Sequence, residues 1–326
     1  MLARFALILL TSACLFSTVQ AAENPVYLDP AKSDADYPFQ GEYAGELTLD
    51  GKASKVGIQV IALGGGTFQA VYHNGGLPGD GFDKSARERV PGKLEGDTVT
   101  FTGPKWLGKL KDKVLTVTDT ANKELGQLKF ILRVSPTMGA KPPEGAVVLF
   151  DGTNVDKWKP GAKMTEDHLL QQGANSIPTY QSCTLHVEFM LPYKPFARGQ
   201  DRGNSGVYLQ ARFETQVLDS FGLEGKMNET GGIYSIKDPD LNMCFPPLTW
   251  QTYDTEYTAA EYKDGQKVKN AKMTVKLNGV EVQHEVELPH ITTSAPNKEG
   301  PEPGWLHLQD HGNPVRYRNI WFLEKK

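Results

Sequence analysis

Near the C-terminus, imidazole and amide side chains alternate with leucines over a few residues. Leu306 and Leu308 alternate with His307, Gln309 and His311, so an extended strand puts the leucines on one face and the polar groups on the other. An imidazole titrates near neutral pH and can transfer protons, and an amide both donates and accepts hydrogen bonds. The segment fits the floor of a polar site, and it fits equally well a half-buried strand whose histidines are merely hydrogen-bonded.

Three more strand-like segments carry polar side chains opposite an apolar face. Their polar positions are Glu188, then Tyr208 and Gln210, then Glu214 and Gln216 with Asp219 just beyond. If the four segments align in one sheet, carboxylate, amide, imidazole and phenol groups line a shallow concave groove. Such groups suit a hydroxyl-rich ligand, because each sugar hydroxyl both donates and accepts. Taken singly, each position also fits an ordinary strand surface, so the prediction depends on the set.

The spacing of Glu214, Gln216 and Asp219 invites comparison with the active-site strand of retaining glucanases. That strand carries Glu-x-Asp-x-(x)-Glu, whereas this chain has glutamine in the middle and a shorter aspartate at the end. Direct glycoside hydrolysis uses two carboxyl groups at a defined separation. The sequence therefore argues against that reaction and leaves other sugar chemistry open.

The elements that must hold these residues are short strands. Runs rich in β-branched and aromatic residues are bounded by Gly, Asp or Asn, and no long helical period interrupts them. We expect an all-β protein in which a Pro/Gly linker, residues 136–145, joins a small β-domain of unknown role (23–135) to a second β-domain (146–326). About nine strands without helices in the second domain predict a jelly-roll sandwich of two sheets.

Two turns are specified by local sequence. Asn278-Gly279, between Leu277 and Val280, favours a type I′ hairpin. The triplet 64–66 is all glycine with strands on both sides, which predicts a hairpin and not a phosphate-binding loop, since the latter needs a following helix. The glycine-rich segment 73–84 favours an irregular surface loop.

The first residues are typical of a secretory signal. Arg4 precedes a mostly apolar run that is too short to span a bilayer, and residues 19–21 give a small-x-small cleavage pattern. We expect residues 1–22 to be removed and the protein to be exported to the periplasm or the extracellular space. A lipoprotein anchored through Cys14 is the weaker alternative. The mature chain then has no integral membrane segment.

Charge and cysteine content narrow the classes of partner. The net charge is −4, or −5 without Arg4, and no Lys/Arg cluster occurs, so we expect neither nucleic acid nor an anionic membrane as partner. Cys183 and Cys244 are too few for a disulfide framework, and two buried free thiols are favoured over one disulfide.

Six motifs in the second domain occur in an order that resembles a known family. They are Leu149-Phe150-Asp151-Gly152, Val187-Glu188-Phe189, residues 203–210, residues 214–220, Gly231-Gly232-Ile233-Tyr234, and residues 308–312 leading to 318–321. Together they resemble the 3-keto-disaccharide hydrolase family, also described as 3-keto-glucoside 1,2-lyase/3-keto-2-hydroxyglucal hydratase, over about residues 146–324. The resemblance implies a concanavalin A-like (lectin/glucanase) sandwich and a sugar or glycoside substrate.

The resemblance also implies chemistry on sugars already oxidised at C3. A C3 ketone acidifies the C2 proton, a base removes it, and the C1 oxygen leaves by β-elimination; water adding to the resulting glycal completes a net hydrolysis. Whether lyase, hydratase or hydrolase activity dominates stays open. A divalent metal ion bridging the C2 and C3 oxygens would serve as the electrophile.

The role of each residue is a hypothesis at this point. His311 is the first choice for proton transfer, and Glu188 and Glu214 are candidates for the second transfer; the same three residues are the expected metal ligands. The residues expected to bind substrate are Asn204, Tyr208, Gln216, Asp219 and Gln309. The alternatives are a non-catalytic, lectin-like carbohydrate-binding protein, because this sandwich often only binds, and an envelope structural protein.

Overall fold

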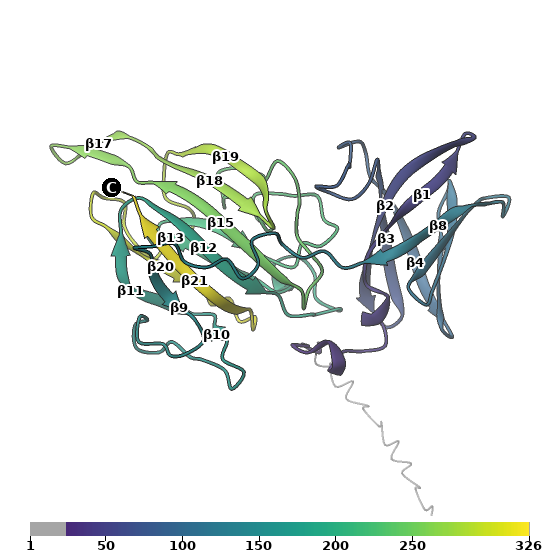
Figure 1. The fold of residues 1–326 in the computed structure, drawn as a ribbon, viewed down its shortest axis with the longest axis horizontal. Coiled ribbons are helices and arrows are strands. Elements are labelled where there is room, and N and C mark those ends of the chain that lie inside the picture. The colour runs from purple at the N-terminus through teal and green to yellow at the C-terminus, as the bar shows by residue number, and fades with distance from the viewer. Residues whose placement is uncertain (1–23, 326) are drawn as a thin grey trace, which may run out of the picture.

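The computed structural model describes residues 24–325, and antiparallel strands dominate it (Figure 1). Three short 3₁₀ turns are the helical elements of this range, which contains no α-helix. The all-β prediction is therefore confirmed. No helix between residues 24 and 325 is long and apolar enough to cross a membrane. The expected signal segment, 1–22, with Cys14, lies outside the described residues, so export and anchoring stay predictions.

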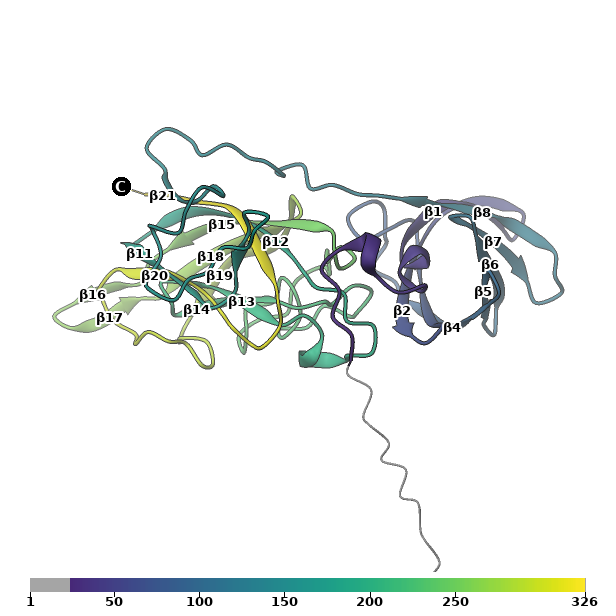
Figure 2. The same ribbon diagram turned by 90° about the horizontal axis from the view of Figure 1, so that it is seen from below.

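Residues 41–131 form a closed eight-stranded barrel, seen as a ring in Figure 2. Closure results because β1 pairs with both β2 and β8. Side chains alternate along each strand, and the inward set, including Tyr43, Ile58 and Phe101, is fully buried. The strands are β1 (Gly41–Leu49), β2 (Lys52–Gly64), β3 (Thr67–Asn74), β4 (Glu88–Glu95), β5 (Thr98–Thr102), β6 (Trp106–Lys111), β7 (Val114–Asp119) and β8 (Glu124–Ile131).

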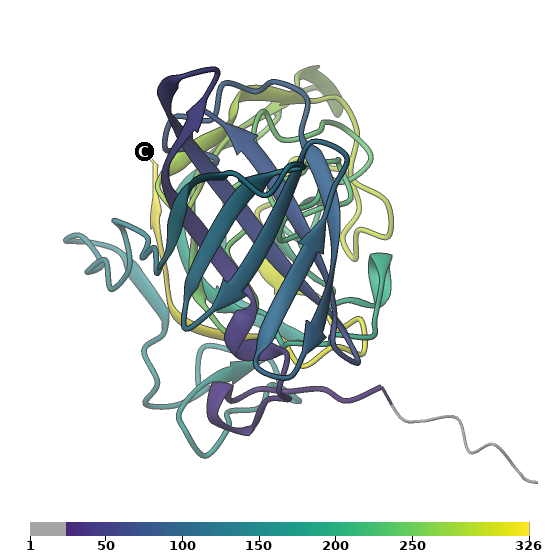
Figure 3. The same cartoon turned by 90° about the vertical axis from the view of Figure 1, so that its right-hand side faces the viewer.

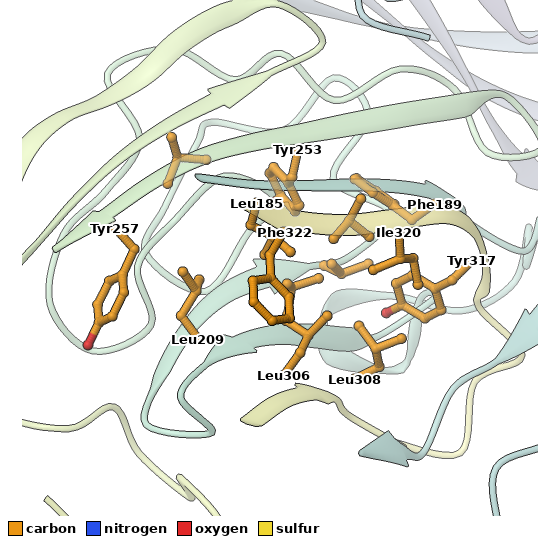
Figure 4. Close-up of a cluster of buried hydrophobic side chains, with 14 of the residues drawn as sticks. Leu185, Phe189, Leu209, Tyr253, Tyr257, Leu306, Leu308, Tyr317, Ile320 and Phe322 are labelled. Carbon is orange, nitrogen blue, oxygen red and sulfur yellow. The ribbon is translucent and has the colours of Figure 1, made fainter. Parts of the chain in front are cut away.

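The C-terminal strands form two sheets packed face to face. The larger sheet has the order β10-β21-β12-β15-β18-β19, with β9 also paired to β21; the smaller has the order β11-β20-β13-β14. Leu185 and Phe189 of the larger sheet face Leu209, Leu306 and Leu308 of the smaller one across the core (Figure 4). This is the predicted two-sheet sandwich.

The bounds of these strands are β9 (Val147–Phe150), β10 (Leu170–Gln171), β11 (Ala174–Tyr180), β12 (Cys183–Met190), β13 (Ser205–Leu209), β14 (Phe213–Val217), β15 (Trp250–Thr258), β18 (Ala271–Leu277), β19 (Val280–Leu288), β20 (Gly304–Leu308) and β21 (Arg316–Glu324). A separate hairpin joins β16 (Glu261–Lys263) to β17 (Gln266–Lys269).

Both turn predictions are confirmed. Asn278 and Gly279 have φ of 53° and 79° and connect β18 to β19 with Leu277 opposite Val280, as a type I′ turn requires. The glycine triplet connects β2 to β3.

Cys183 and Cys244 are free and buried, and burial raises the pKa of both thiols.

The barrel is docked against the sandwich domain, which lies behind it in Figure 3. Ile61 and Val71 lie on the outer face of the barrel and pack against Phe221 of the sandwich domain. Arg89 donates to the Gly222 carbonyl at 2.9 Å and forms an ion pair with Glu224 at 2.6 Å. Apolar burial and partly buried charge pairs thus connect the two domains.

The segment 73–84 belongs to this junction, so it is not the ordinary surface loop that its glycines suggest. Leu77 is fully buried, and the Pro78 carbonyl accepts a hydrogen bond from Arg133. Gly79 has φ of 76° and lies so close to Met243 that a Cβ would fall 2.7 Å from its sulfur. Only glycine combines this backbone conformation with such a close approach.

The predicted linker is extended but not free. Its Gly139 N–H donates to Glu188 Oε1 at 2.6 Å, and the Ala140 carbonyl accepts from Asn319 and Trp321 at 3.1 Å each. The segment runs along the larger sheet from β8 to the sandwich (Figure 2). We call residues 135–142 the strap.

Candidate active site

A small polar cavity of about 70 Å³ lies over the outer face of the smaller sheet. Strands β13, β14 and β20 supply its floor, because their alternate residues point away from the sandwich core. Loops that follow or cover these strands supply the rest. The lining residues are Gln200, Asn204, Tyr208, Glu214, Gln216, Tyr234, Thr293, Ser294, Gln309 and His311.

Glu214 is the buried acid of this cavity. Its side chain is 2% exposed, and the Tyr208 hydroxyl donates to Oε2 at 2.7 Å. Burial disfavours the carboxylate and raises the pKa of Glu214 to about 7, although the Tyr208 hydrogen bond opposes this shift. The group is therefore divided between acid and carboxylate at neutral pH, as a proton-transfer residue requires.

The position of Glu214 depends on a glycine in the neighbouring strand. Gly206 lies directly opposite Gln216, and a Cβ there would fall 2.2 Å from Glu214 Oε1 and 2.9 Å from the Tyr208 ring. The missing side chain leaves the space that both functional groups occupy. Gly206 thus has a packing role that its place in a strand would not suggest.

Tyr208 connects Glu214 to the last strand of the smaller sheet. Gln309 Nε2 donates to the Tyr208 hydroxyl at 3.1 Å, and the His307 ring meets the Tyr208 ring edge-on at 5.2 Å. His307 Nδ1 lies 2.9 Å from Asn175 Oδ1, and burial lowers the pKa of His307 to about 4. His307 is neutral at ordinary pH and supports Tyr208.

Amides form the opposite part of the cavity. Gln200 Oε1 accepts from Asn204 at 3.2 Å and from Gln216 at 3.3 Å. Asn204 Oδ1 is buried and has no hydrogen-bond partner among the described residues. A buried acceptor of this kind is satisfied when a ligand hydroxyl donates to it.

His311 lies at the rim, in the loop that follows β20. It is exposed, and its backbone carbonyl accepts a hydrogen bond from Asn313. Six of the predicted residues therefore line one cavity. They are His311 at the rim and Asn204, Tyr208, Glu214, Gln216 and Gln309.

Glu188 does not lie in this cavity, which corrects the expectation that four strands share one polar face. Its strand β12 pairs with β15 and β21 in the larger sheet. Because Val187 and Phe189 face the core, Glu188 points away from it on the opposite side of the sandwich from Glu214. The predicted alternation of β12 is confirmed, with Val187 and Phe189 in the core, but alternation does not determine which sheet a strand joins.

Glu188 instead anchors the strap. It is 1% exposed, and Arg318 Nε donates to it at 2.6 Å and Asn319 at 2.9 Å. Burial by itself raises the pKa of Glu188, but the nearby His186 and the hydrogen bonds from Asn319, Arg318 and Gly139 outweigh it and lower the pKa to about 2. Glu188 is therefore ionised at neutral pH, and its role is structural.

Asp219 also lies outside the lining of the cavity. Its Oδ2 accepts from Arg202 Nε at 2.6 Å, and Arg202 reaches the Ala62 carbonyl of the barrel at 3.3 Å. The predicted sugar contact is therefore a buried ion pair near the domain junction. It follows β14 directly, and the chain turns away from the sheet there.

The residues assembled here do not form the expected metal site. The predicted ligands Glu188, Glu214 and His311 are divided between the two outer faces of the sandwich, and no cluster of three or more His, Cys, Asp or Glu suited to a metal ion occurs within residues 24–325. Glu214 is the one carboxylate in the cavity lining. This donor set does not fit a three-ligand protein site.

Four lining residues have no counterpart in the sequence predictions: Gln200, Tyr234, Thr293 and Ser294. Tyr234 ends one of the six ordered motifs, which was a usable signal. Of the other three, Gln200 lies in the 3₁₀ turn Gly199–Asp201, and Thr293 and Ser294 lie in a loop. These segments have no periodicity, and only their packing brings them to β13 and β14.

The sandwich domain is similar to known proteins. A family model described as a 3-keto-alpha-glucoside-1,2-lyase-like domain matches residues 145–323. A solved structure of a glycosyl hydrolase candidate from Parabacteroides distasonis ATCC 8503, at 2.13 Å, is 29% identical with a TM-score of 0.52, and the match covers 56% of this chain and 85% of that one. A second such candidate from the same organism, at 1.70 Å, is 21% identical with a TM-score of 0.42, covering 56% and 95%. No curated protein matches the chain.

Proposed function

The chain belongs to the 3-keto-alpha-glucoside-1,2-lyase-like family, and from that premise we propose that its sandwich domain cleaves 3-keto-glycosides by β-elimination. The family and the 29%-identical structure support a carbohydrate-active protein. The observation that supports the finer proposal is Glu214, a buried carboxyl group whose pKa of about 7 suits proton transfer inside a cavity lined by sugar-binding groups.

The reaction begins at C2 of the sugar. The Glu214 carboxylate takes the proton next to the C3 ketone, and the electron pair of that C–H bond forms the enolate. When the enolate collapses, the C1–O bond breaks and a C1=C2 double bond forms. Water adding at C1, with a proton returned to C2, gives the free 3-keto sugar and completes a net hydrolysis.

The neighbouring residues stabilise charge and supply protons. The second amide N–H groups of Asn204 and Gln216, which Gln200 does not use, are donors toward the enolate oxygen and the ring hydroxyls. The Tyr208 hydroxyl donates to Glu214. His311, at the rim, protonates the departing C1 oxygen, because an exposed imidazole can pass protons between the substrate and solvent. Gln309 holds Tyr208 in place.

No step is assigned to a metal ion, because the donor set does not fit one. A metal ion that enters with the substrate oxygens stays a separate proposal, and chelation tests it.

Export to the periplasm or the extracellular space is likewise a proposal. It is tested by whether the N-terminus of the protein recovered outside the cytoplasm starts after Ala21 or Ala22.

The experiment is turnover of a 3-keto-glucoside, followed by loss of the keto sugar and release of the aglycone, with and without EDTA. We expect turnover by the parent protein, a loss on the order of 10²–10⁴-fold in Glu214→Gln, and a smaller loss in His311→Ala. The control is Glu256→Gln, which changes an exposed carboxylate of the larger sheet and should keep full activity.

Two results would overturn the proposal. Full activity of Glu214→Gln removes its role as the base. Failure of the parent protein to consume the keto sugar removes the reaction; saturable sugar binding would then favour the lectin-like alternative, and its absence the structural one.

A further inference from the structure

The barrel of the N-terminal domain is closed at one end and open at the other. At the closed end the 3₁₀ turn Tyr37–Phe39 covers the strands: the Phe39 ring lies 5.9 Å from that of Phe68, and Tyr43 donates to the Phe39 carbonyl at 2.9 Å. The β1–β2 hairpin marks the other end, where no such turn covers the described strands. A small eight-stranded barrel can hold one small ligand in such a position.

The open end contains a cavity of about 650 Å³, within the usual size range of small-molecule sites. Its walls come from inward positions at the ends of the strands: Leu47, Leu49, Tyr72, Glu88, Trp106 and Leu125. Glu88 faces inward because it is two residues before Val90, which belongs to the barrel core. The Glu88 carboxylate and the Trp106 indole thus lie among apolar side chains on the wall, while Thr48, Asp50, Lys105, Asp119 and Lys123 are the other polar residues of the lining.

Two polar atoms of this mouth have no hydrogen-bond partner. Trp106 is 5% exposed and its Nε1 is unpaired among residues 24–325, and Glu88 Oε1 is likewise buried and unpaired there. Buried N–H and carboxylate groups are nearly always paired, so an unpaired donor and an unpaired acceptor in one cavity need an explanation. Lys105 Nζ, 3.7 Å from Glu88 Oε2, leaves the other oxygen free.

We propose that the barrel mouth binds one neutral, hydroxylated ring, such as a monosaccharide or the sugar of a glycoside. The ring's hydroxyls accept from Trp106 Nε1 and donate to Glu88 Oε1, a combination of donor and acceptor that a hydrocarbon does not provide. The leucines and Tyr72 cover the C–H face of the ring. The charges around the mouth nearly cancel, so they do not select a charged ligand. The acidic groups are Asp50, Glu88 and Asp119, and the basic groups are Lys105 and Lys123. This site is in the other domain and does not depend on the reaction proposed above.

The test is calorimetric titration of the full chain with phenyl β-D-glucopyranoside, which has both a sugar ring and an apolar ring. We expect saturable binding that weakens at least about tenfold in Trp106→Phe, which removes the N–H but keeps an aromatic ring, and in Glu88→Gln, which keeps the shape but changes the acceptor. Both variants should turn over a 3-keto-glucoside like the parent protein, because they lie outside the sandwich cavity.

Matched variants separate this site from the sandwich. Glu95→Gln, at the opposite end of β4 from Glu88, and Glu214→Gln should both leave the binding unchanged. The proposal is overturned if the glucoside does not bind, if Trp106→Phe and Glu88→Gln bind it as tightly as the parent protein, or if Glu214→Gln alone abolishes binding. Thermal melts of Glu88→Gln establish that the variant is folded.

Discussion

Glu214 is a carboxyl group whose burial works against its own charge. The pKa is about 7 in the folded protein against an ordinary value near 4.5 in the unfolded chain. Since the unfolded chain ionises more readily, the folded state loses stability as the pH rises from about 4.5 to 7, and the loss persists above 7. A functional acid held in this way lowers stability at the pH where it works.

Replacing the acid by its uncharged isostere should therefore stabilise the protein while it stops turnover. We expect Glu214→Gln to be more stable than the parent protein by about 2–3 kcal/mol above pH 7 and nearly equal to it near pH 4. Urea unfolding at several pH values measures the difference. A difference that does not change with pH would contradict the raised pKa.

The same pKa predicts that kcat/KM of the parent protein rises with pH through about 7 as the base ionises.

At the scale of elements, two carboxylates hold the strap, and Glu188 is the more deeply buried of them. Glu188 receives hydrogen bonds from the Gly139 backbone, from Arg318 and from Asn319, and Thr137 Oγ1 donates to Asp254 at 2.6 Å. Because the pKa of Glu188 is lowered to about 2, its stabilising effect is complete above pH 4.5 and is lost as the pH falls toward 2.

Glu188→Gln should loosen the strap without touching the cavity. We expect a loss of about 2 kcal/mol, less than for a fully buried pair because Arg318 is partly exposed, and faster thermolysin cleavage before Met138, since Pro142 blocks trypsin after Lys141. Unfolding and limited proteolysis measure the two effects, with Glu256→Gln as control on the same face. Equal cleavage rates in the variant and the parent protein would show that the strap does not depend on Glu188.

At the scale of the whole molecule, the barrel and the sandwich share a buried contact. Phe221 is buried against Ile61 and Val71, and Glu224 pairs with Arg87 and Arg89. Gly222 packs so closely on Ile61 that a Cβ would lie 2.5 Å from it. We infer that the two domains unfold as one unit.

Phe221→Ala should uncouple the domains. Loss of the ring costs about 3 kcal/mol, and we expect the single calorimetric transition to divide into two, because each domain has its own core. Ile177→Ala, at an exposed position, is the control and should keep one transition. Two transitions already present in the parent protein would contradict the coupling.

The sequence by itself determined the strands, the hairpin at Asn278-Gly279 and six of the residues that meet in the cavity. These features depend on side-chain alternation, turn chemistry and ordered motifs, all of which are local and can be read along the chain. Tertiary structure alone decided that Glu188 and Glu214 belong to opposite faces, because strand pairing and not sequence distance fixes the sheet. It also decided that Asp219 pairs with Arg202, that loop residues complete the cavity, and that Trp106 and Glu88 meet in the barrel mouth. Each of these depends on contacts between distant segments, which no local pattern encodes.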